Sequence, residues 1–281
     1  MCLRDRLFRM FGCQFGPRRR GYIRRCIEMC TYFQEEVFGT TPYPWQQEVI
    51  AHLCCMVIPN SGIPPAPVLL VRPTGGGKSA VRDVFSIMNG GFSLTITPLL
   101  SLGADQEAKI TLKAKHTAGK VLSVHLDEIR SMNDQKDLVM ELKRLPPDGH
   151  TTVLLFLSPQ AILNKKFPWS DFLDWLIINK RLSLVCVDEV HLFVHFGLTF
   201  RDEFKGLTPV LFDKLKVGGS AALTTIPLLF MTGTCSTTRL FHHLRSFLVY
   251  GLIPSTMYSG HWPKQCNTVG FSLKGLTLRR Y

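Results

Sequence analysis

The most constraining feature of the sequence is a glycine-rich segment at residues 72–79, which reads Arg-Pro-Thr-Gly-Gly-Gly-Lys-Ser. It follows the apolar run 68–71 and precedes a segment with apolar residues at helical spacing, as expected for a strand, a loop and a helix. Consecutive glycines let several backbone N–H groups turn toward phosphate oxygens, and a helix N-terminus adds positive charge. The loop therefore predicts a site for a nucleoside triphosphate, with a flexible turn that binds nothing as the alternative.

Single positions of this loop have distinct expected roles. Lys78 would reach the outer phosphates, and the Ser79 hydroxyl would bind Mg²⁺. Arg72 stands where the pattern G-x-x-x-x-G-K-[ST] has its first glycine, so the match to that pattern is incomplete. The residues expected to bind the nucleotide are Thr74, Gly75, Gly76, Gly77, Lys78 and Ser79.

A second candidate site follows the apolar run 182–187, where the chain continues with Asp188, Glu189 and His191. A carboxylate at the carboxyl end of a strand can hold hydrated Mg²⁺, and a second one can orient the attacking water. We therefore expect Asp188 to share Mg²⁺ with Ser79, and Glu189 and His191 to belong to the catalytic group. Acidic residues that merely end a strand at the solvent edge are the alternative.

Strand-like runs alternate with helix-patterned segments along the chain. Strands are predicted at 68–71, 92–97, 121–126, 152–157, 182–187 and 226–231, and helices at 22–37, 134–145, 169–178 and 236–248. Such alternation predicts an α/β fold with a parallel sheet covered by helices on both faces. Ligands of such sheets bind outside the carboxyl ends of the strands, so both candidate sites are expected in one cleft.

Further motifs accompany these two sites in a characteristic order. They are Phe38-Gly39 with 43–50, Thr97-Pro98-Leu99-Leu100-Ser101-Leu102 with Asp105-Gln106, Ser158-Pro159-Gln160, Phe196-Gly197-Leu198-Thr199-Phe200-Arg201 and 230–235. Together they resemble a RecQ-like superfamily 2 DNA helicase with a DEAD/DEAH-type ATP-binding domain. The resemblance implies a RecA-like P-loop NTPase fold, ATP and Mg²⁺ as cofactors, DNA as partner and 3'-5' strand separation.

The resemblance also implies roles for single residues. Gln47 would read the adenine edge, with Gln46 as the alternative, and Thr232 with Thr234 would couple the nucleotide state to strand contacts. Residues 196–201 depart from the family pattern, which leaves that coupling open, and their phenylalanines could instead pack a core edge. The residues expected to contact nucleic acid are Ser101, Asp105, Gln106, Phe196, Phe200 and Arg201.

Composition fits an intracellular globular protein, because 46% of the 281 residues are hydrophobic and 19% are charged. We expect one large domain at 26–250 and no membrane span, because no long stretch is free of charged and strongly polar residues. The nine cysteines lack a repeated C-x-x-C spacing, which argues against a zinc ribbon and against a secreted disulfide framework.

The formal net charge of +12 is concentrated near the N-terminus. Residues 1–25 hold eight arginines against one acid, Asp5, for a net charge of +7. This segment is expected to be a disordered basic arm that can bind phosphate backbone nonspecifically. A nuclear-import signal, a mitochondrial presequence and a solvated tail are the alternatives, so nucleus and mitochondrion both remain open as locations.

Relatives of this superfamily place ATP between two RecA-like lobes, and residues 251–281 resemble the start of a linker toward a second lobe. We therefore expect that a second lobe or a partner protein supplies the arginine finger, an arginine that can increase the rate of hydrolysis roughly 10³- to 10⁵-fold. Two alternatives to a DNA helicase lobe remain at this point. One is a truncated nucleic-acid-binding remnant that does not hydrolyse ATP, and the other is the lobe of an RNA helicase.

Overall fold

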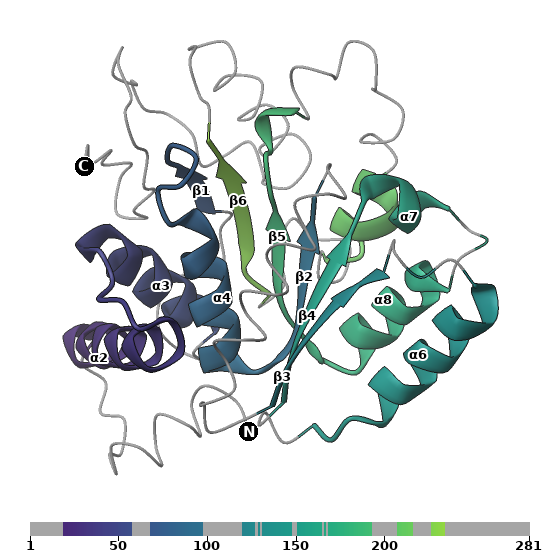
Figure 1. Cartoon of the computed structure of the whole chain (residues 1–281), viewed down its shortest axis with the longest axis horizontal. Helices are drawn as coiled ribbons and strands as arrows, with labels where there is room; N and C mark the ends of the chain where they lie inside the picture. The colour runs from purple at the N-terminus through teal and green to yellow at the C-terminus, as the bar shows by residue number, and fades with distance from the viewer. Residues whose placement is uncertain are drawn as a thin grey trace.

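The computed structural model shows a parallel sheet with helices on both sides (Figure 1). The residues that it describes are 19–57, 68–97, 120–126, 129, 131–147, 151–164, 166, 168–192, 207–215 and 226–233. No helix in these ranges is long and apolar enough to cross a membrane.

Six parallel strands form the sheet in the order β1-β6-β5-β2-β4-β3. The strands are β1 (Val68–Val71), β2 (Gly91–Ile96), β3 (Lys120–His125), β4 (Thr151–Leu157), β5 (Leu182–Val187) and β6 (Leu228–Thr232). All six were predicted from the sequence, β1 and β5 with the observed bounds and the others to within two residues. The predicted α/β fold with a parallel sheet is confirmed.

The helices also follow the sequence patterns. They are α2 (Arg19–Phe38), α3 (Pro44–Val57), α4 (Lys78–Asn89), α6 (Met132–Arg144), α7 (Pro159–Leu163) and α8 (Trp169–Ile178), with the short π-helix η4 (Thr208–Phe212). The predicted helix 169–178 has the observed bounds of α8. Neither α7 nor η4 was predicted, because five residues contain too little periodicity to recognise. The predicted helix 236–248 lies outside the described residues.

Two of these helices have an N-cap residue whose side chain accepts a backbone hydrogen bond. Ser131 accepts a hydrogen bond from the N–H of Asp134 at the start of α6, and Asp134 itself lies in the first turn, where a negative charge is favourable. Ser158 accepts from the N–H of Ala161 at 3.2 Å at the start of α7, which has Pro159 as its first residue. The Ser158-Pro159-Gln160 segment thus begins a short helix at the end of β4.

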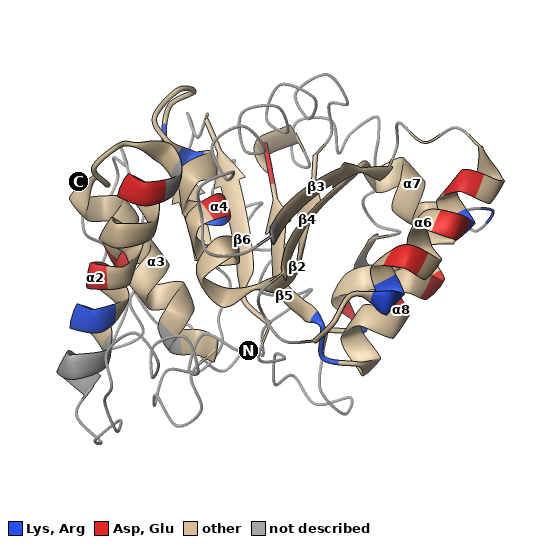
Figure 2. Ribbon diagram, turned by 60° about the horizontal axis from the view of Figure 1, so that its bottom comes forward, with Lys and Arg blue, Asp and Glu red and all other residues tan. Residues whose placement is uncertain are grey.

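The two faces of the sheet pack against different helices (Figure 1; Figure 2 shows the same arrangement from another side). On one face α2, α3 and α4 pack against β1, β6 and β5 through side chains such as Leu70, Leu184 and Met231. On the other face α6, α7 and α8 pack against inward-facing residues of the sheet such as Leu94 and Leu155. Alternate residues of the central strands enter opposite cores, which explains why strands such as β1 and β6 read as continuous apolar runs.

Strand order determines which loops meet at the carboxyl edge. Because β6 lies between β1 and β5, the segment that follows β6 separates the glycine-rich loop from the acidic segment. Val71 is paired with Thr232, and Val187 with Phe230, so the three strands end within two residues of each other. The two sequence motifs therefore flank Thr232 at the same edge of the sheet.

Candidate nucleotide site

The glycine-rich loop connects β1 to α4 and requires glycine at three successive positions. Gly75 and Gly77 have φ angles of +77° and +83°, which side chains of L-residues rarely adopt. A Cβ on Gly76 would lie 2.9 Å from the carbonyl oxygen of Pro73. The α4 helix then begins at Lys78 without a side-chain cap, so its first N–H groups remain available to an anion.

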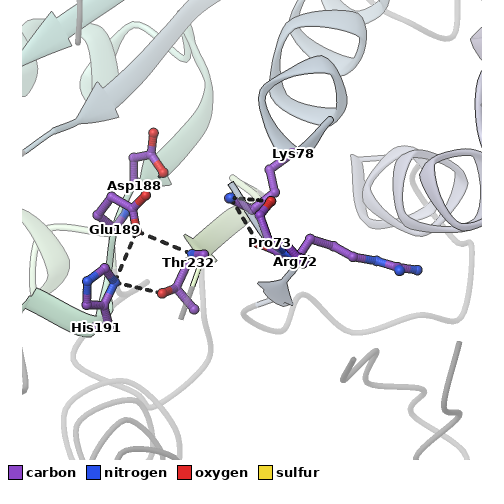
Figure 3. Close-up of polar contacts among 8 residues, drawn as sticks. Arg72, Pro73, Lys78, Asp188, Glu189, His191 and Thr232 are labelled. Carbon is purple, nitrogen blue, oxygen red and sulfur yellow. Dashed lines mark hydrogen bonds and ion pairs between the residues drawn. The ribbon is translucent and has the colours of Figure 1, made fainter. Parts of the chain in front are cut away.

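Lys78 lies inside this loop and is only 8% exposed. Its ammonium group donates to the carbonyl oxygen of Arg72 at 2.9 Å and to that of Pro73 at 3.2 Å (Figure 3). The positive charge is thus held among backbone oxygens of the loop that precedes it. Phosphate oxygens could replace these carbonyls as the acceptors, because an ammonium group is a point charge with three rotatable donors.

The acidic segment turns sharply after β5. Glu189 has a φ angle of +47°, and its N–H donates to the Asp188 carboxylate at 2.9 Å. The N–H of Val190 then donates to the carbonyl oxygen of Met231, which ties the turn to β6. Left-handed backbone at a residue other than glycine is uncommon and often occurs at functional sites.

Asp188 is 9% exposed, and burial raises the pKa of its carboxyl group above the ordinary value. The buried guanidinium of Arg82 opposes that rise, and so does the hydrogen bond from Glu189. The carboxylate therefore occupies a position where its charge is disfavoured until a cation compensates it. Such a position is consistent with a ligand for Mg²⁺, which binds through one or two carboxylates together with phosphate oxygens.

Three side chains form a polar cluster beside Asp188 (Figure 3). Nδ1 of His191 lies 2.8 Å from the hydroxyl of Thr232 and 3.0 Å from Oε2 of Glu189. The same carboxylate oxygen accepts from the N–H of Gly233 at 3.3 Å. Glu189 and His191 are thereby connected directly to the end of β6.

Gly233 completes the connection between the acidic cluster and the loop. A Cβ at this position would lie 3.0 Å from the hydroxyl of Thr74 and 3.5 Å from Nζ of Lys78. The residue that donates to Glu189 therefore also lies beside the glycine-rich loop, with no room for a larger side chain. The structure brings the loop, Lys78 and the acidic cluster to one edge of the sheet, and Thr232 and Gly233 lie between them.

The two neighbouring glutamines of α3 point to different partners. Gln46 is buried and donates from Nε2 to the carbonyl oxygen of Gly77 at 2.9 Å. Gln47 donates instead to the hydroxyl of Thr31 on α2 at 2.9 Å. Gln47 was the first choice for the adenine contact, but the structure brings Gln46, the alternative, to the loop, because successive helical residues point about 100° apart.

Sequence reasoning missed two further features at this site. The guanidinium of Arg72 lies 4.6 Å from the centre of the Trp45 ring, which is itself stacked on Tyr43 at 6.4 Å. Inside α4, Arg82 is fully buried and pairs with Asp83 at 2.7 Å. Two adjacent charges between apolar neighbours in α4 were the available signal for this pair, and the missing first glycine was the signal at Arg72.

Several predicted site residues lie outside the described part of the chain. Nothing structural is added for the basic arm up to residue 18 or for the linker segment 251–281. The predicted site residues in this group are Ser101, Asp105, Gln106, Phe196, Phe200, Arg201 and Thr234.

Known proteins with similar sequences are ATP-dependent DNA helicases. The chain is 30% identical to "ATP-dependent DNA helicase Q-like 5" of Arabidopsis thaliana over 157 residues, which are 56% of this chain and 15% of that protein. It is 28% identical to "ATP-dependent DNA helicase Q5" of Mus musculus over 137 residues, 49% of this chain and 13% of the relative. The chain is related to the RecQ-like helicases.

Two other comparisons add nothing to this relationship. No family profile matches the chain. The helicase domain of Pyrococcus furiosus Hef superposes with a TM-score of 0.46 at 14% identity, covering 76% of this chain and 37% of that structure. Because the matched segments are less than a quarter of each RecQ-like relative, the activity of those whole proteins is a matter for proposal.

Proposed function

We propose that residues 26–250 form the ATP-binding domain of a RecQ-like DNA helicase and couple ATP hydrolysis to strand separation in the intact enzyme. The observation that carries this proposal is the meeting of Lys78 with the Glu189–His191–Thr232 cluster at one edge of the sheet, across Gly233. A phosphate-binding loop facing a metal-binding and a water-orienting carboxylate is the arrangement that phosphoryl transfer requires. The names of the relatives point to the same reaction.

The chain supplies a distinct group for each task. Backbone N–H groups of the loop and the ammonium of Lys78 would bind the phosphate oxygens. The Ser79 hydroxyl, in the first turn of α4, and the Asp188 carboxylate would hold Mg²⁺, which when bound neutralises charge that develops on the phosphates. Glu189 would orient the attacking water from its fixed, left-handed position.

His191 and Thr232 would transmit the state of the nucleotide. The hydrogen bond between them joins the segment after β5 to the end of β6, and Glu189 belongs to the same cluster. A movement of Glu189 on hydrolysis would therefore be transmitted to Thr232 through Nδ1 of His191, which contacts both residues. Thr234, two residues further on, and the residues at 101–106 and 196–201 are proposed to carry the contacts to DNA.

Nucleotide binding and hydrolysis by the purified chain test this proposal. Equilibrium binding of a fluorescent ATP analogue and ATP turnover would be measured with and without single-stranded DNA. Lys78→Ala is expected to weaken binding, and Glu189→Gln to retain binding but lose turnover by roughly 10²-fold or more, typical of a lost catalytic proton-transfer group. Competition between DNA and RNA strands identifies the preferred nucleic acid.

The outcomes separate the candidate functions. Turnover that is stimulated by DNA and lost in both variants supports a helicase motor. Binding of ATP and DNA without turnover would instead indicate either a lobe that needs the arginine finger of a second lobe or partner, or a binding remnant. A clear preference for RNA would favour an RNA-acting enzyme. Absence of nucleotide binding in the wild-type chain would refute the proposal.

A further inference from the structure

Gln46 joins three segments of the chain through one side-chain amide. Its Oε1 accepts from the N–H of Tyr43 at 2.8 Å and from Nε2 of Gln34 at 3.1 Å. Its Nε2 donates to the carbonyl oxygen of Gly77 at 2.9 Å. A hydrogen-bonded path therefore runs from the buried interior of α2 to the last residue before α4.

The partners of Gln46 permit only one orientation of its amide. A backbone N–H can only donate, so Oε1 must face Tyr43, and a carbonyl can only accept, so Nε2 must face Gly77. The bond to Tyr43 is also half of a capping box, because Gln46 is the third residue of α3 and reaches back to the residue before Pro44. Both lone pairs of Oε1 are thus in use.

This occupancy determines what Gln46 can recognise. A glutamine that reads adenine must accept a hydrogen bond from the amino group of the base while it donates to a ring nitrogen. Gln46 has no lone pair left for an amino group while Tyr43 and Gln34 hold it. The geometry therefore favours a role toward the loop over a role toward the base.

The bond from Gln46 also orients the peptide group between Gly77 and Lys78. In a trans peptide the C=O and the N–H point in opposite directions, so a carbonyl held toward Gln46 turns the N–H of Lys78 away from it. That N–H is one of the unpaired donors at the start of α4 that can bind an anion. A Cβ on Gly77 would lie 2.8 Å from Nε2 of Gln46, so this contact also explains the need for glycine.

Gln34 is the second member of the pair and is only 3% exposed. Its Oε1 is buried, and among the described residues it has no hydrogen-bond partner. A buried carbonyl without a partner destabilises a fold, so an apolar residue would suit this position better if packing were the only requirement. What Gln34 contributes is the hydrogen bond to Gln46.

We propose that Gln34 is a positioning residue, which acts through Gln46 to fix the peptide of Gly77 and so serves the triphosphate rather than the base. This inference rests on the proposed nucleotide-binding function and extends it to α2. It makes the interior of an N-terminal helix part of the nucleotide site, although no atom of Gln34 would touch the ligand.

Nucleotide affinities of matched variants test the inference. Gln34→Leu removes the donor at similar volume, and Gln135→Leu is the control, since Gln135 is also buried but lies on α6, where it donates to Ile129. Dissociation constants for Mg·ATP and Mg·GTP would be measured by calorimetry, with melting temperatures to verify folding. We expect Gln34→Leu to weaken binding of both nucleotides about tenfold, as for one lost hydrogen bond, and Gln135→Leu to leave both unchanged.

The pattern of loss is the decisive readout. An equal loss for ATP and GTP supports the inference, and Gln46→Met, which removes the same amide, should reproduce it if Gln34→Leu folds poorly. A loss of affinity confined to ATP would show that Gln46 reads the base. No loss of affinity in either variant would show that Gln34 and Gln46 do not contribute to nucleotide binding. Both results overturn the inference. If the wild-type chain bound neither nucleotide, the proposed function itself would fail, which is a distinct outcome.

Discussion

The two faces of the central sheet contain different kinds of side chain, and β2 shows the difference within one strand. Its residues Phe92, Leu94 and Ile96 enter the core under α6 and α8. The alternate residues Ser93 and Thr95 face α4 and are equally buried. One side of the same strand is hydrocarbon, whereas the other is lined with hydroxyl groups.

The helices repeat this difference. The side of the sheet that faces α4 is its polar face. The α4 helix contributes the buried pair Arg82 and Asp83 to this face, and α2 and α3 contribute Gln34 and Gln46. Asp188 belongs to the same face, because it follows Leu184 and Cys186 at the alternation of β5. Groups that bear on the nucleotide site thus concentrate on one face, and the other face supplies mainly apolar burial. Variants on the two faces should separate stability from ligand binding.

The largest effect is expected on the opposite side of the sheet, the apolar face, which packs against α6, α7 and α8. Phe172 on α8 is 1% exposed and meets Phe92 edge to face at 5.9 Å. Phe172→Ala should lower the free energy of unfolding by about 3–5 kcal/mol, the usual cost of such a cavity. Urea denaturation measures the loss, with the half-exposed Tyr32→Ala as the control. Nucleotide affinity of the folded fraction should not change, and a tenfold loss of affinity would contradict the division between the faces.

Arg82 and Asp83 provide the corresponding test on the polar face. Burial raises the pKa of Asp83, and the charge of Arg82 opposes the rise, so each charge depends on the other. Arg82→Leu alone should destabilise the fold by about 3 kcal/mol, because it leaves Asp83 buried and unpaired.

The double variant Arg82→Met/Asp83→Leu sharpens this test. Paired replacement of a buried ion pair by apolar residues is often close to neutral, so the stability measured by urea denaturation should largely return. If the double variant were as unstable as Arg82→Leu, the charges would have a structural role beyond compensating each other. Because Arg82 lies near Asp188, nucleotide binding by the stable double variant then reports what the charge contributes to the site.

A smaller effect is expected at the His191–Thr232 contact. His191→Ala should leave nucleotide affinity within twofold but reduce DNA-stimulated turnover about tenfold, equivalent to about 1.4 kcal/mol. Thr232→Val removes the same hydrogen bond with little change in shape. The double variant should lose no more than the larger single loss, and additive losses would show that the two residues act separately.

Sequence patterns predicted the sheet and the backbone of the site more completely than its side-chain contacts. Apolar runs such as 182–187 mark buried parallel strands because both of their faces are covered, and a run of glycines marks a phosphate-binding turn because few other residues adopt its angles. These signals are local in the chain. The location of the site at the carboxyl edge of the sheet followed from these signals, because ligands of parallel sheets bind outside the carboxyl ends of the strands.

Contacts between distant segments could not be predicted in the same way. The choice between Gln46 and Gln47 depends on the rotation of α3 relative to α4, which adjacent and identical residue types do not reveal. The partnership of Gln34 with Gln46 likewise depends on the packing of α2 on α3. The contact of Arg72 with the Trp45 ring exists because the fold brings the loop next to α3. Such contacts depend on tertiary packing rather than on local periodicity.

The smallest predicted effect concerns Asp188, where stability and ligand binding should oppose each other. A carboxyl group whose pKa is raised in the folded state holds its proton more tightly there than in the unfolded chain. The ionised form is therefore a full cost to the fold at pH values above the raised pKa, and this cost decreases as the pH falls from the raised pKa toward the ordinary pKa of the unfolded chain. At pH 7.5, Asp188→Asn should be more stable than the wild type by about 0.5–1 kcal/mol, although it loses Mg²⁺-dependent turnover.

Urea midpoints at pH 7.5 and pH 5 measure this difference, with the exposed Asp137→Asn as a control that should stay within about 0.5 kcal/mol of the wild type at both pH values. The advantage of Asp188→Asn should be smaller at the lower pH, because protonation of the wild-type carboxyl begins at a higher pH in the folded state than in the unfolded chain. A variant that is less stable than the wild type at both pH values would mean that Arg82 and the N–H of Glu189 more than compensate the buried charge. Asp188 would then stabilise the polar face without any ligand. The predicted gain instead describes a carboxylate whose burial is favourable only when a cation binds beside it.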